Sequence, residues 1–213
     1  MITTVIFDLD GTLLNTLQDL VDSVNFSLYA HNFPKRTLSE IRMFLGNGYK
    51  YLISHAVPEN TPESKIAEVL DTFKSYYQEH CLDTTKPYAG IWEMLQELKK
   101  KGIKMAIVSN KGNDAVQELT QRFFEELIPI AVGESAKVRR KPSPDTVWAA
   151  MQQLGSEKNE SIYVGDSEVD FETAKNAGIP CISCSWGFRD ESFLQKIGVT
   201  TIIHQPAELL TSL

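Results

Sequence analysis

Short, nearly uninterrupted apolar runs of strand length recur along this 213-residue chain, and they constrain its fold more than any other feature. A strand that is covered on both faces is apolar throughout, as in parallel sheets with helices on each side. Amphipathic stretches lie between the runs, for example Ile91, Leu95 and Leu98 at helical spacing before Gly102. The sequence therefore predicts an α/β fold with a doubly wound parallel sheet. The predicted strands are residues 4–8, 104–109, 128–132, 161–165, 181–185 and 200–204.

The interval from about residue 15 to residue 85 breaks this alternation, because it has helical patterns and no convincing strand. Turns that contain proline, at 58–60 and 86–88, interrupt it. We predict an all-helical cap domain over residues 15–85, inserted into an α/β core domain of residues 1–14 and 86–213. The apolar residues at helical spacing are Leu20, Val24 and Leu28; Ile41, Phe44 and Leu45; and Ile66, Val69, Leu70 and Phe73.

Charge and composition exclude several classes of protein. The net charge is −7, which argues against the basic surface of a general nucleic-acid binder. No apolar run reaches the length of a membrane span, and strand-like residues from Thr3 onward leave no room for a signal peptide. We therefore expect a cytoplasmic protein with no membrane partner. Cys181 and Cys184 match C-x-x-C, but they lie in a strand-like run and are interpreted as core thiols rather than a redox or metal site.

Polar side chains follow several predicted strands at the points where the strands end. Asp8 ends the first strand, and Asp166 follows the fourth. Ser109 and Asn110 end the second, and Lys141 stands just before a predicted helix. In an open, Rossmann-like sheet, ligands bind beyond the carboxyl ends of the strands. We therefore expect these side chains to meet at one site.

The acidic residues suit a hard cation. Asp8 and Asp10 flank a single residue, and Gly11 lets the chain turn so that a carboxylate and a backbone carbonyl can face one spot. Such close acids repel each other unless a cation lies between them, and oxygen ligands suit Mg²⁺. The alternative for Asp8 is a simple strand-end turn. Residues 168–177 are predicted to form a helix that ends before Gly178. The alternative for Asp170, which lies one turn after Asp166, is stabilisation of the N-terminus of this helix.

The basic and neutral residues suit a phosphate group. Lys141 precedes Ser143, a predicted helix N-cap, and Pro144, a predicted first helical residue, so its ammonium can reach the strand ends. There it would neutralise an acid and a phosphoryl oxygen. Ser109 offers a hydroxyl and Asn110 an amide as donors to phosphate oxygens. The alternative for Ser109 is a polar strand terminus.

In this order, the residues resemble the four motifs of the haloacid dehalogenase-like hydrolase superfamily, from residue 5 to about residue 190. The predicted helical insertion is similar to the small cap of the phosphoglycolate phosphatase and β-phosphoglucomutase branch. Residues 42–53 resemble the substrate-facing loop of that cap. The four motifs are Asp8-x-Asp10-Gly11-Thr12, Ser109-Asn110, Lys141 and Gly165-Asp166-Ser167-x-x-Asp170.

The resemblance implies a Mg²⁺-dependent phosphatase with an aspartyl-phosphate intermediate. Asp8 would attack phosphorus, while Asp10 would protonate the leaving oxygen and then activate the hydrolytic water. Ser109 and Lys141 would hold the phosphoryl oxygens. The implied metal-binding residues are Asp8, Asp10 through its carbonyl, Asp166, and Asp170 as the residue that orients metal-bound waters.

The implied substrate is a small phosphorylated metabolite: phosphoglycolate, or a similar phospho-acid or phosphosugar. Arg42, Asn47 and Lys50 are the cap candidates for contacts beyond the phosphate, although arginine and lysine on a helical cap are more often solvated. Residues 186–189 are a further candidate for the edge of the site. The sequence does not indicate an oligomeric state.

Three alternatives were weighed against this interpretation. A dehalogenase on this fold would need neither Asp10 nor a metal site. A phosphosugar mutase would keep Asp10, but it usually has a histidine soon after the first motif, and the first histidine here is His31. The branch more often has an acid and a serine where Asn15 and Thr16 stand, which concerns the cap hinge rather than the chemistry. The third alternative is a catalytically silent protein that binds a phosphorylated ligand.

Overall fold

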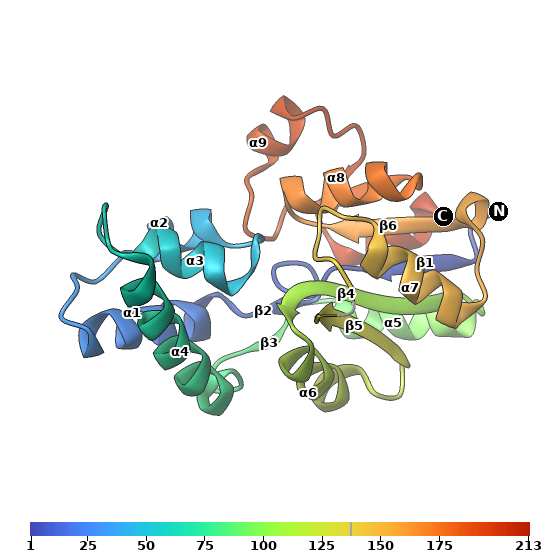
Figure 1. The fold of residues 1–213 in the computed structure, drawn as a ribbon. Helices are drawn as coiled ribbons and strands as arrows, with labels where there is room; N and C mark the ends of the chain where they lie inside the picture. The colour runs from blue at the N-terminus through green and yellow to red at the C-terminus, as the bar shows by residue number, and fades with distance from the viewer. Residues whose placement is uncertain (137) are drawn as a thin grey trace. The chain divides into compact units, whose positions relative to one another are not determined.

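The computed structural model describes residues 1–136 and 138–213, and a six-stranded parallel sheet forms the core of the α/β part of the chain (Figure 1). Its strand order is β5-β4-β1-β6-β7-β8, which corresponds to 3-2-1-4-5-6 when the strands of this sheet are counted along the chain. This is the order of a Rossmann-type sheet, and the order reverses between β1 and β6. The predicted fold class is confirmed. The strands are β1 (Thr4–Phe7), β4 (Lys104–Gly112), β5 (Ile130–Glu134), β6 (Ser161–Gly165), β7 (Cys181–Cys184) and β8 (Ile202–Ile203).

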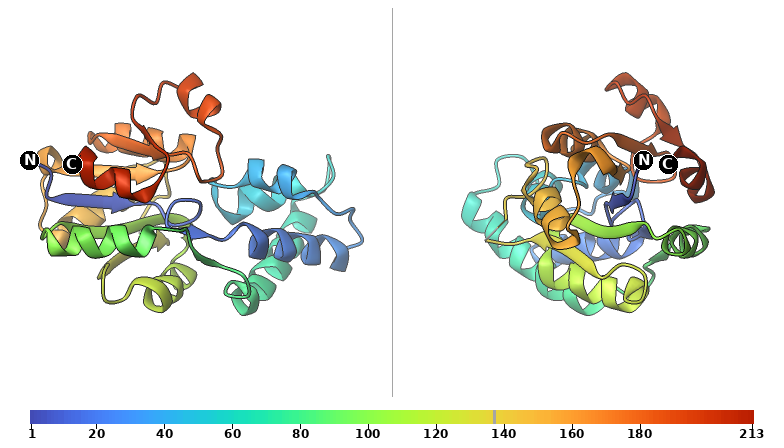
Figure 2. Two further views of the ribbon diagram at one scale, coloured as in Figure 1. Left: turned by 180° about the vertical axis from the view of Figure 1, so that it is seen from behind. Right: turned by 90° about the vertical axis from the view of Figure 1, so that its right-hand side faces the viewer.

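Helices cover both faces of this sheet, as apolar parallel strands require (Figure 2). Alternate residues of β1 point to opposite faces, with Val5 and Phe7 in one core cluster and Ile6 in the other. The first cluster contains α5 (Ile91–Lys100), α6 (Asn113–Phe124) and α10 (Leu209–Ser212). The second contains α7 (Asp145–Leu154) and α8 (Glu168–Ala177). The remaining elements of this part of the chain are η1 (Lys158–Glu160), α9 (Glu191–Lys196) and η2 (Pro206–Glu208).

Strand β4 differs most from its prediction, because it continues past Ser109 to Gly112. Its register against β5 shifts within this extension: Val108 pairs with Val132, whereas Gly112 pairs with Glu134. Extra residues in one strand form a β-bulge, which re-aims the side chains that it contains. The bulge falls on the segment from Ser109 to Lys111. The last predicted strand is shorter than expected, because only Ile202–Ile203 pairs with β7.

Two helix predictions were wrong in detail. Helix α7 begins at Asp145 with Pro144 in the capping position, and the Ser143 hydroxyl donates to the Asp145 carboxylate rather than capping a backbone N–H. Residues 42–53, expected as a loop, are mostly helical. They comprise the end of α2 (Leu38–Phe44), a short break and most of α3 (Gly48–Ala56), whose buried Leu52, Ile53 and Ala56 follow helical spacing.

The chain divides into two compact units, one of residues 1–15 with 87–213 and the other of residues 16–86. The second unit consists of α1 (Leu17–Ala30), α2, α3 and α4 (Glu63–His80), and no strand occurs between residues 16 and 85. Helix α2 begins with a capping box, in which the Thr37 hydroxyl and the Glu40 carboxylate each accept a bond from the other's backbone N–H. The short strands β2 (Leu14–Asn15) and β3 (Lys86–Pro87) pair where the chain connects the units. The core of the second unit contains Val24, Leu28, Ile41, Ile53, Val69 and Phe73.

One buried carboxylate stabilises the second unit. Asp19 in α1 is 2% exposed, and it accepts hydrogen bonds from the backbone N–H and hydroxyl groups of both Thr84 and Thr85. We expect Asp19→Ala to lower the free energy of unfolding by about 2–3 kcal/mol, because it leaves these donors without an acceptor. Thermal unfolding followed by circular dichroism measures the effect. Asp22→Ala, at an exposed position of the same helix, is the control and should change it by less than about 0.5 kcal/mol; equal effects would contradict the assignment.

The described residues contain no helix long and apolar enough to cross a membrane.

Candidate active site

The reversal of strand order brings two carboxylates together. Asp8 follows β1 directly, Asp166 follows β6, and these strands are neighbours with Phe7 opposite Val164. The backbone N–H of Asp8 donates to the carbonyl of Val164 at 2.9 Å, which continues the ladder up to the site. Carboxyl ends of parallel strands at such a reversal are where open α/β sheets bind ligands.

Three aspartates form a compact cluster at this edge. Carboxylate oxygens of Asp8, Asp166 and Asp170 all lie within 4.8 Å of one another. Their residues are only 5%, 1% and 1% exposed, so water screens the three charges poorly. Asp170 comes from the first turn of α8, and it is the partner of Ser167 in a capping box at the start of that helix. Asp170 therefore caps the start of α8 and also belongs to the aspartate cluster.

Lys141 lies inside the acidic cluster. Its Nζ is 2.6 Å from Asp8 Oδ1, 2.7 Å from Asp170 Oδ1 and 3.1 Å from the Tyr163 hydroxyl. The lysine is 3% exposed, and its loop is fastened to β4 by Asn110. The Asn110 amide donates to the Lys141 carbonyl, and its oxygen accepts from the Lys141 backbone N–H. Asn110 thus positions Lys141, and its predicted contact with phosphate oxygens stays a prediction.

Asp170 is the most extensively hydrogen-bonded member of the cluster. Its Oδ1 accepts bonds from Lys141 and from the Tyr163 hydroxyl, at 2.8 Å for the latter. Its Oδ2 accepts from the Ser167 hydroxyl at 2.6 Å and from the backbone N–H groups of Ser167 and Asp166. Each Asp170 oxygen accepts at least two hydrogen bonds, whereas the oxygens of Asp166 accept one each from Thr12 and Phe188, so Asp170 is better suited to orient its neighbours than to bind an ion directly.

The pKa shifts of the clustered groups reflect an excess of negative charge, because three aspartates face one lysine. Burial and the charge of Asp170 raise the pKa of Asp8 well above its ordinary value, although Lys141 opposes the shift. Burial and Asp170 also raise the pKa of Asp166 to about 7. Burial acts in the same direction on Asp170, but Lys141 and the hydrogen bonds outweigh it, so the pKa of Asp170 is lowered. Burial lowers the pKa of Lys141, but Asp170 and Asp8 outweigh it and keep the ammonium charged.

The raised pKa of Asp166 predicts how stability depends on pH when metal is absent. An acid that holds its proton more tightly in the folded than in the unfolded chain stabilises the fold most below its ordinary pKa. That contribution is lost as the pH rises through about 7. In the presence of a chelator we expect the unfolding temperature to fall between about pH 4 and pH 7, as the free energy of unfolding decreases by on the order of a few kcal/mol. Asp166→Asn should flatten this part of the profile, and an unchanged slope in that variant would contradict the assignment.

The loop after β7 encloses Asp166. The backbone N–H of Phe188 donates to Asp166 Oδ2 at 2.6 Å, and the Thr12 hydroxyl donates to Oδ1 at 3.1 Å. Gly11 has a φ of +91°, and a Cβ there would lie 2.5 Å from Asp166 Oδ2. A Cβ on Gly187 would also overlap Asp166. Both glycines allow the backbone to approach this carboxylate closely.

Residues 186–189 border the site, as the sequence analysis expected for its edge. The Trp186 indole donates to the carbonyl of Thr12 at 3.0 Å. Arg189 is tied to Glu168 through two of its nitrogens, at 2.7 and 2.9 Å. These contacts fix the loop to the first motif and to the start of α8.

The bulge in β4 places three consecutive polar residues at the site, of which the sequence analysis found two. The backbone N–H of Lys111 donates to Ser109 Oγ at 3.1 Å, and the predicted contact of this hydroxyl with phosphate stays a prediction. The Lys111 ammonium, with a side chain 1% exposed, lies 2.9 Å from Asp10 Oδ1. The sequence analysis missed Lys111, because it ended the strand at Ser109. It also missed Tyr163, whose hydroxyl faces Lys141 and Asp170 from the middle of β6.

The three predicted cap residues lie in the second unit and are described there by themselves. Arg42 is in the last turn of α2, and Asn47 precedes α3 without making a side-chain capping bond. Lys50 is exposed and forms an ion pair with Glu63 at 2.5 Å. A role for these residues in substrate binding stays a prediction.

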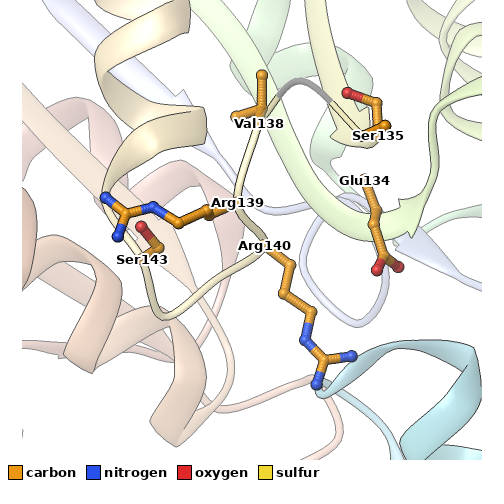
Figure 3. A pocket seen from close by; sticks show the side chains of 7 residues that line it. Glu134, Ser135, Val138, Arg139, Arg140 and Ser143 are labelled. Atoms are coloured by element: carbon orange, nitrogen blue, oxygen red, sulfur yellow. The ribbon is translucent and has the colours of Figure 1, made fainter.

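The pocket in Figure 3 is a different feature of the core unit. It has a volume of about 500 Å³, and the residues that line it come from the last residue of β5 and the loop between β5 and α7. None of these lining residues is a carboxylate of the cluster. Arg139, on its wall, is engaged by Asp145 through two nitrogens. We therefore assign the site to the aspartate cluster.

The donor set of the cluster fits a hard divalent cation. The carboxylates of Asp8 and Asp166 supply oxygen ligands, which Mg²⁺ prefers. Lys141 is the ammonium in contact with two of the three carboxylates, so a second cation would relieve the repulsion that raises the pKa values of Asp8 and Asp166. The fold and the site define an α/β protein with a buried acidic centre whose oxygen donors fit a hard cation.

Comparison with known proteins identifies the family. The model of the haloacid dehalogenase-like hydrolases matches residues 5–184. A phosphoglycolate phosphatase of Pseudomonas syringae pv. tomato is 33% identical over 86% of this chain and 70% of its own length. One from Haemophilus influenzae is 30% identical over 97% and 96%, respectively. A crystal structure of a candidate phosphoglycolate phosphatase from Lactobacillus delbrueckii subsp. bulgaricus is 34% identical, with a TM-score of 0.94 over 99% of this chain and 97% of that one.

The chain belongs to the haloacid dehalogenase-like hydrolases, in their phosphoglycolate phosphatase-like branch. It is accordingly a hydrolase of the phosphatase class.

Proposed function

We propose that this phosphatase hydrolyses a small phosphate monoester with Mg²⁺ as cofactor and Asp8 as nucleophile. The observation that carries the proposal is the contact of Lys141 with Asp8, 2.6 Å long, within a buried cluster of three aspartates. An aspartate that is held by a lysine and faces a cation-accepting carboxylate is arranged to attack a phosphorus atom rather than to close a turn.

Magnesium would be held by the carboxylates of Asp8 and Asp166 and by the backbone carbonyl of Asp10, with Asp170 fixing the surrounding groups. When bound, the ion supplies positive charge that offsets the repulsion between Asp8 and the phosphate. The hydrogen bonds from Phe188 and Thr12 hold Asp166 in place for this role.

In the first half of the reaction, an Asp8 oxygen forms a bond to phosphorus while the bond from phosphorus to the ester oxygen breaks. Asp10, two residues further on, gives its proton to the departing oxygen. The product alcohol leaves, and the phosphoryl group remains on Asp8. Ser109 donates its hydroxyl hydrogen, and Lys141 its charge, to the phosphoryl oxygens as negative charge spreads over them.

In the second half, Asp10 is a carboxylate and takes a proton from water. The oxygen of that water bonds to phosphorus, the bond to Asp8 breaks, and inorganic phosphate is released. Proton and charge balance over the cycle, because Asp10 ends as the acid with which it began. The reaction is thus divided into two easier displacements at phosphorus, and both of them use Asp8 and Asp10.

The substrate that we propose is phosphoglycolate or a similar small phospho-acid or phosphosugar. The names of the two curated relatives support this choice. The net charge of −7 supports a small metabolite rather than a nucleic acid as the partner, since no excess of basic residues is available for a polyanion. Three free cysteines suit a reducing compartment such as the cytoplasm.

A turnover screen tests the proposal. It would compare 4-nitrophenyl phosphate, phosphoglycolate, hexose phosphates, nucleoside monophosphates and pyrophosphate, each with Mg²⁺ and with a chelator. We expect release of phosphate only with Mg²⁺, and the highest kcat/KM for phosphoglycolate or a related phospho-acid. No turnover of any ester with Mg²⁺ would refute the proposed function. Conversion of a sugar 1-phosphate into its 6-phosphate without release of phosphate would indicate a mutase.

A further inference from the structure

Lys111 is a buried cation to which the proposed mechanism gives no role. It lies at the end of β4, in the bulge where the register against β5 shifts. Its side chain is 1% exposed, and Nζ lies 2.9 Å from Asp10 Oδ1. Burying an ammonium costs solvation free energy, and an ion pair with a carboxylate often does not recover all of it. A buried Lys–Asp pair is therefore a weak way to stabilise a fold, which favours a role in the site. Bulges commonly occur next to active sites, where they redirect a side chain.

The two buried lysines of the site are directed at different aspartates. Lys141 contacts Asp8 and Asp170, which belong to the side of the nucleophile and the cation. Lys111 contacts Asp10, whose side chain is 18% exposed and therefore borders solvent. The main chain of Lys111 also acts on the site, because its N–H donates to Ser109 Oγ. One residue thus links the phosphate-binding serine to the proton-transferring aspartate.

We propose that Lys111 is a positioning residue that holds the carboxyl group of Asp10 where it can transfer a proton to the leaving oxygen. The inference rests on the proposed function. Asp10 follows the end of β1 in a turn, and its side chain has two torsions that must be fixed before the carboxylate can meet the substrate. An ion pair from the neighbouring strand fixes Oδ1, and the planar carboxylate then has its second oxygen in a defined place. Lys111 makes no bond to the reacting atoms.

The competing role for Lys111 is direct binding of phosphate. The two roles differ in how the effect of a substitution depends on the leaving group. A phosphate-binding lysine acts equally on all esters, whereas a lysine that positions the acid matters most when the leaving oxygen is strongly basic. The relevant quantity is kcat/KM, because it reports the steps up to the first irreversible one, the transfer of the phosphoryl group to Asp8.

We expect Lys111→Met, which preserves the length of the side chain and removes its charge, to lower kcat/KM for an alkyl phosphate about 30- to 100-fold. The loss for 4-nitrophenyl phosphate, whose leaving group needs little protonation, should be at least about 5-fold smaller. Lys111→Arg should recover most of the activity, because it restores a cation at this place. Circular dichroism and thermal unfolding check that each variant is folded.

A double-mutant cycle with Asp10→Asn gives the decisive comparison. If Lys111 acts through Asp10, Lys111→Met in the Asp10→Asn background should lower kcat/KM by less than about 2-fold further. An equal loss in both backgrounds, or an equal loss for both esters, would overturn the inference and assign Lys111 to phosphate binding. If Lys111→Met does not fold, the same cycle with Lys111→Gln decides, since glutamine also removes the charge that contacts Asp10. A wild-type chain without turnover would overturn the proposed function itself, whereas an active chain with an additive cycle overturns only this inference.

Discussion

Replacing Asp8 by asparagine is expected to lower the rate of phosphate release by at least about 10⁴-fold, the largest effect of any single substitution in this chain. Asparagine has almost the same shape, but its neutral amide is not a nucleophile and cannot accept the phosphoryl group. Steady-state release of phosphate from 4-nitrophenyl phosphate, with saturating Mg²⁺, measures the loss. The electrostatic surroundings of Asp8 make this variant informative in a second way.

The same substitution should not destabilise the metal-free fold. Burial and the charge of Asp170 raise the pKa of Asp8, so the charged form of Asp8 is disfavoured there and a neutral amide removes that penalty. We expect the unfolding temperature of Asp8→Asn in chelator to equal or exceed that of the wild type. Asp114→Asn, at an exposed position of α6, is the matched control and should keep activity within about 2-fold. Residual activity above about a tenth of the wild type would exclude Asp8 as the nucleophile.

Removal of divalent cations is expected to have the second largest effect, a loss of turnover of at least about 100-fold that added Mg²⁺ reverses. Lys141 contacts two of the three clustered carboxylates, and the pKa of Asp166 is raised to about 7 in the absence of a further cation. Without the cation, burial and the charge of Asp170 favour the neutral form of Asp8 by raising its pKa, and the phosphate meets uncompensated negative charge from its neighbours. Dialysis against a chelator, followed by titration with Mg²⁺ at constant ionic strength, gives the dependence.

A measurement other than activity separates a bound ion from an effect on the substrate. A ligand that binds only the folded state raises the unfolding temperature with its concentration. We expect Mg²⁺ to do so for the wild type and for Lys111→Met, but not for Asp166→Asn. An equal rise in Asp166→Asn, or full activity after exhaustive chelation, would contradict a metal site at this cluster.

The central strands and their polar ends were predictable because local pattern and tertiary environment agree there. Strand β6 has the predicted bounds, Ser161–Gly165, and α8 has the predicted bounds, Glu168–Ala177. In both, a run of apolar or amphipathic residues is closed by glycine, and nothing in the tertiary structure overrides that signal. Edge strand β8 was predicted too long, because an apolar run shows only that residues are buried and does not show how many of them pair.

The residues that were missed depend on geometry that sequence spacing does not specify. Lys111 reaches Asp10 because of a bulge, and a register shift in β4 leaves no mark in the apolar pattern. Tyr163 has the appearance of an ordinary core residue, and only its hydroxyl contacts with Lys141 and Asp170 give it a place in the site. The sequence contains one signal for Lys111, which is its position directly after two polar residues at a strand end.

Trapping the phosphorylated enzyme tests the central claim most directly. The wild-type protein would be mixed with substrate and Mg²⁺, quenched with acid during the first turnover, and reduced with borohydride, which converts an aspartyl phosphate into homoserine. Peptide mass spectrometry then locates the product. We predict homoserine at position 8 and at no other aspartate, dependent on Mg²⁺ and absent from Asp8→Asn. Release of phosphate in the first turnover without any homoserine at position 8, or with homoserine at another aspartate, would contradict Asp8 as the nucleophile.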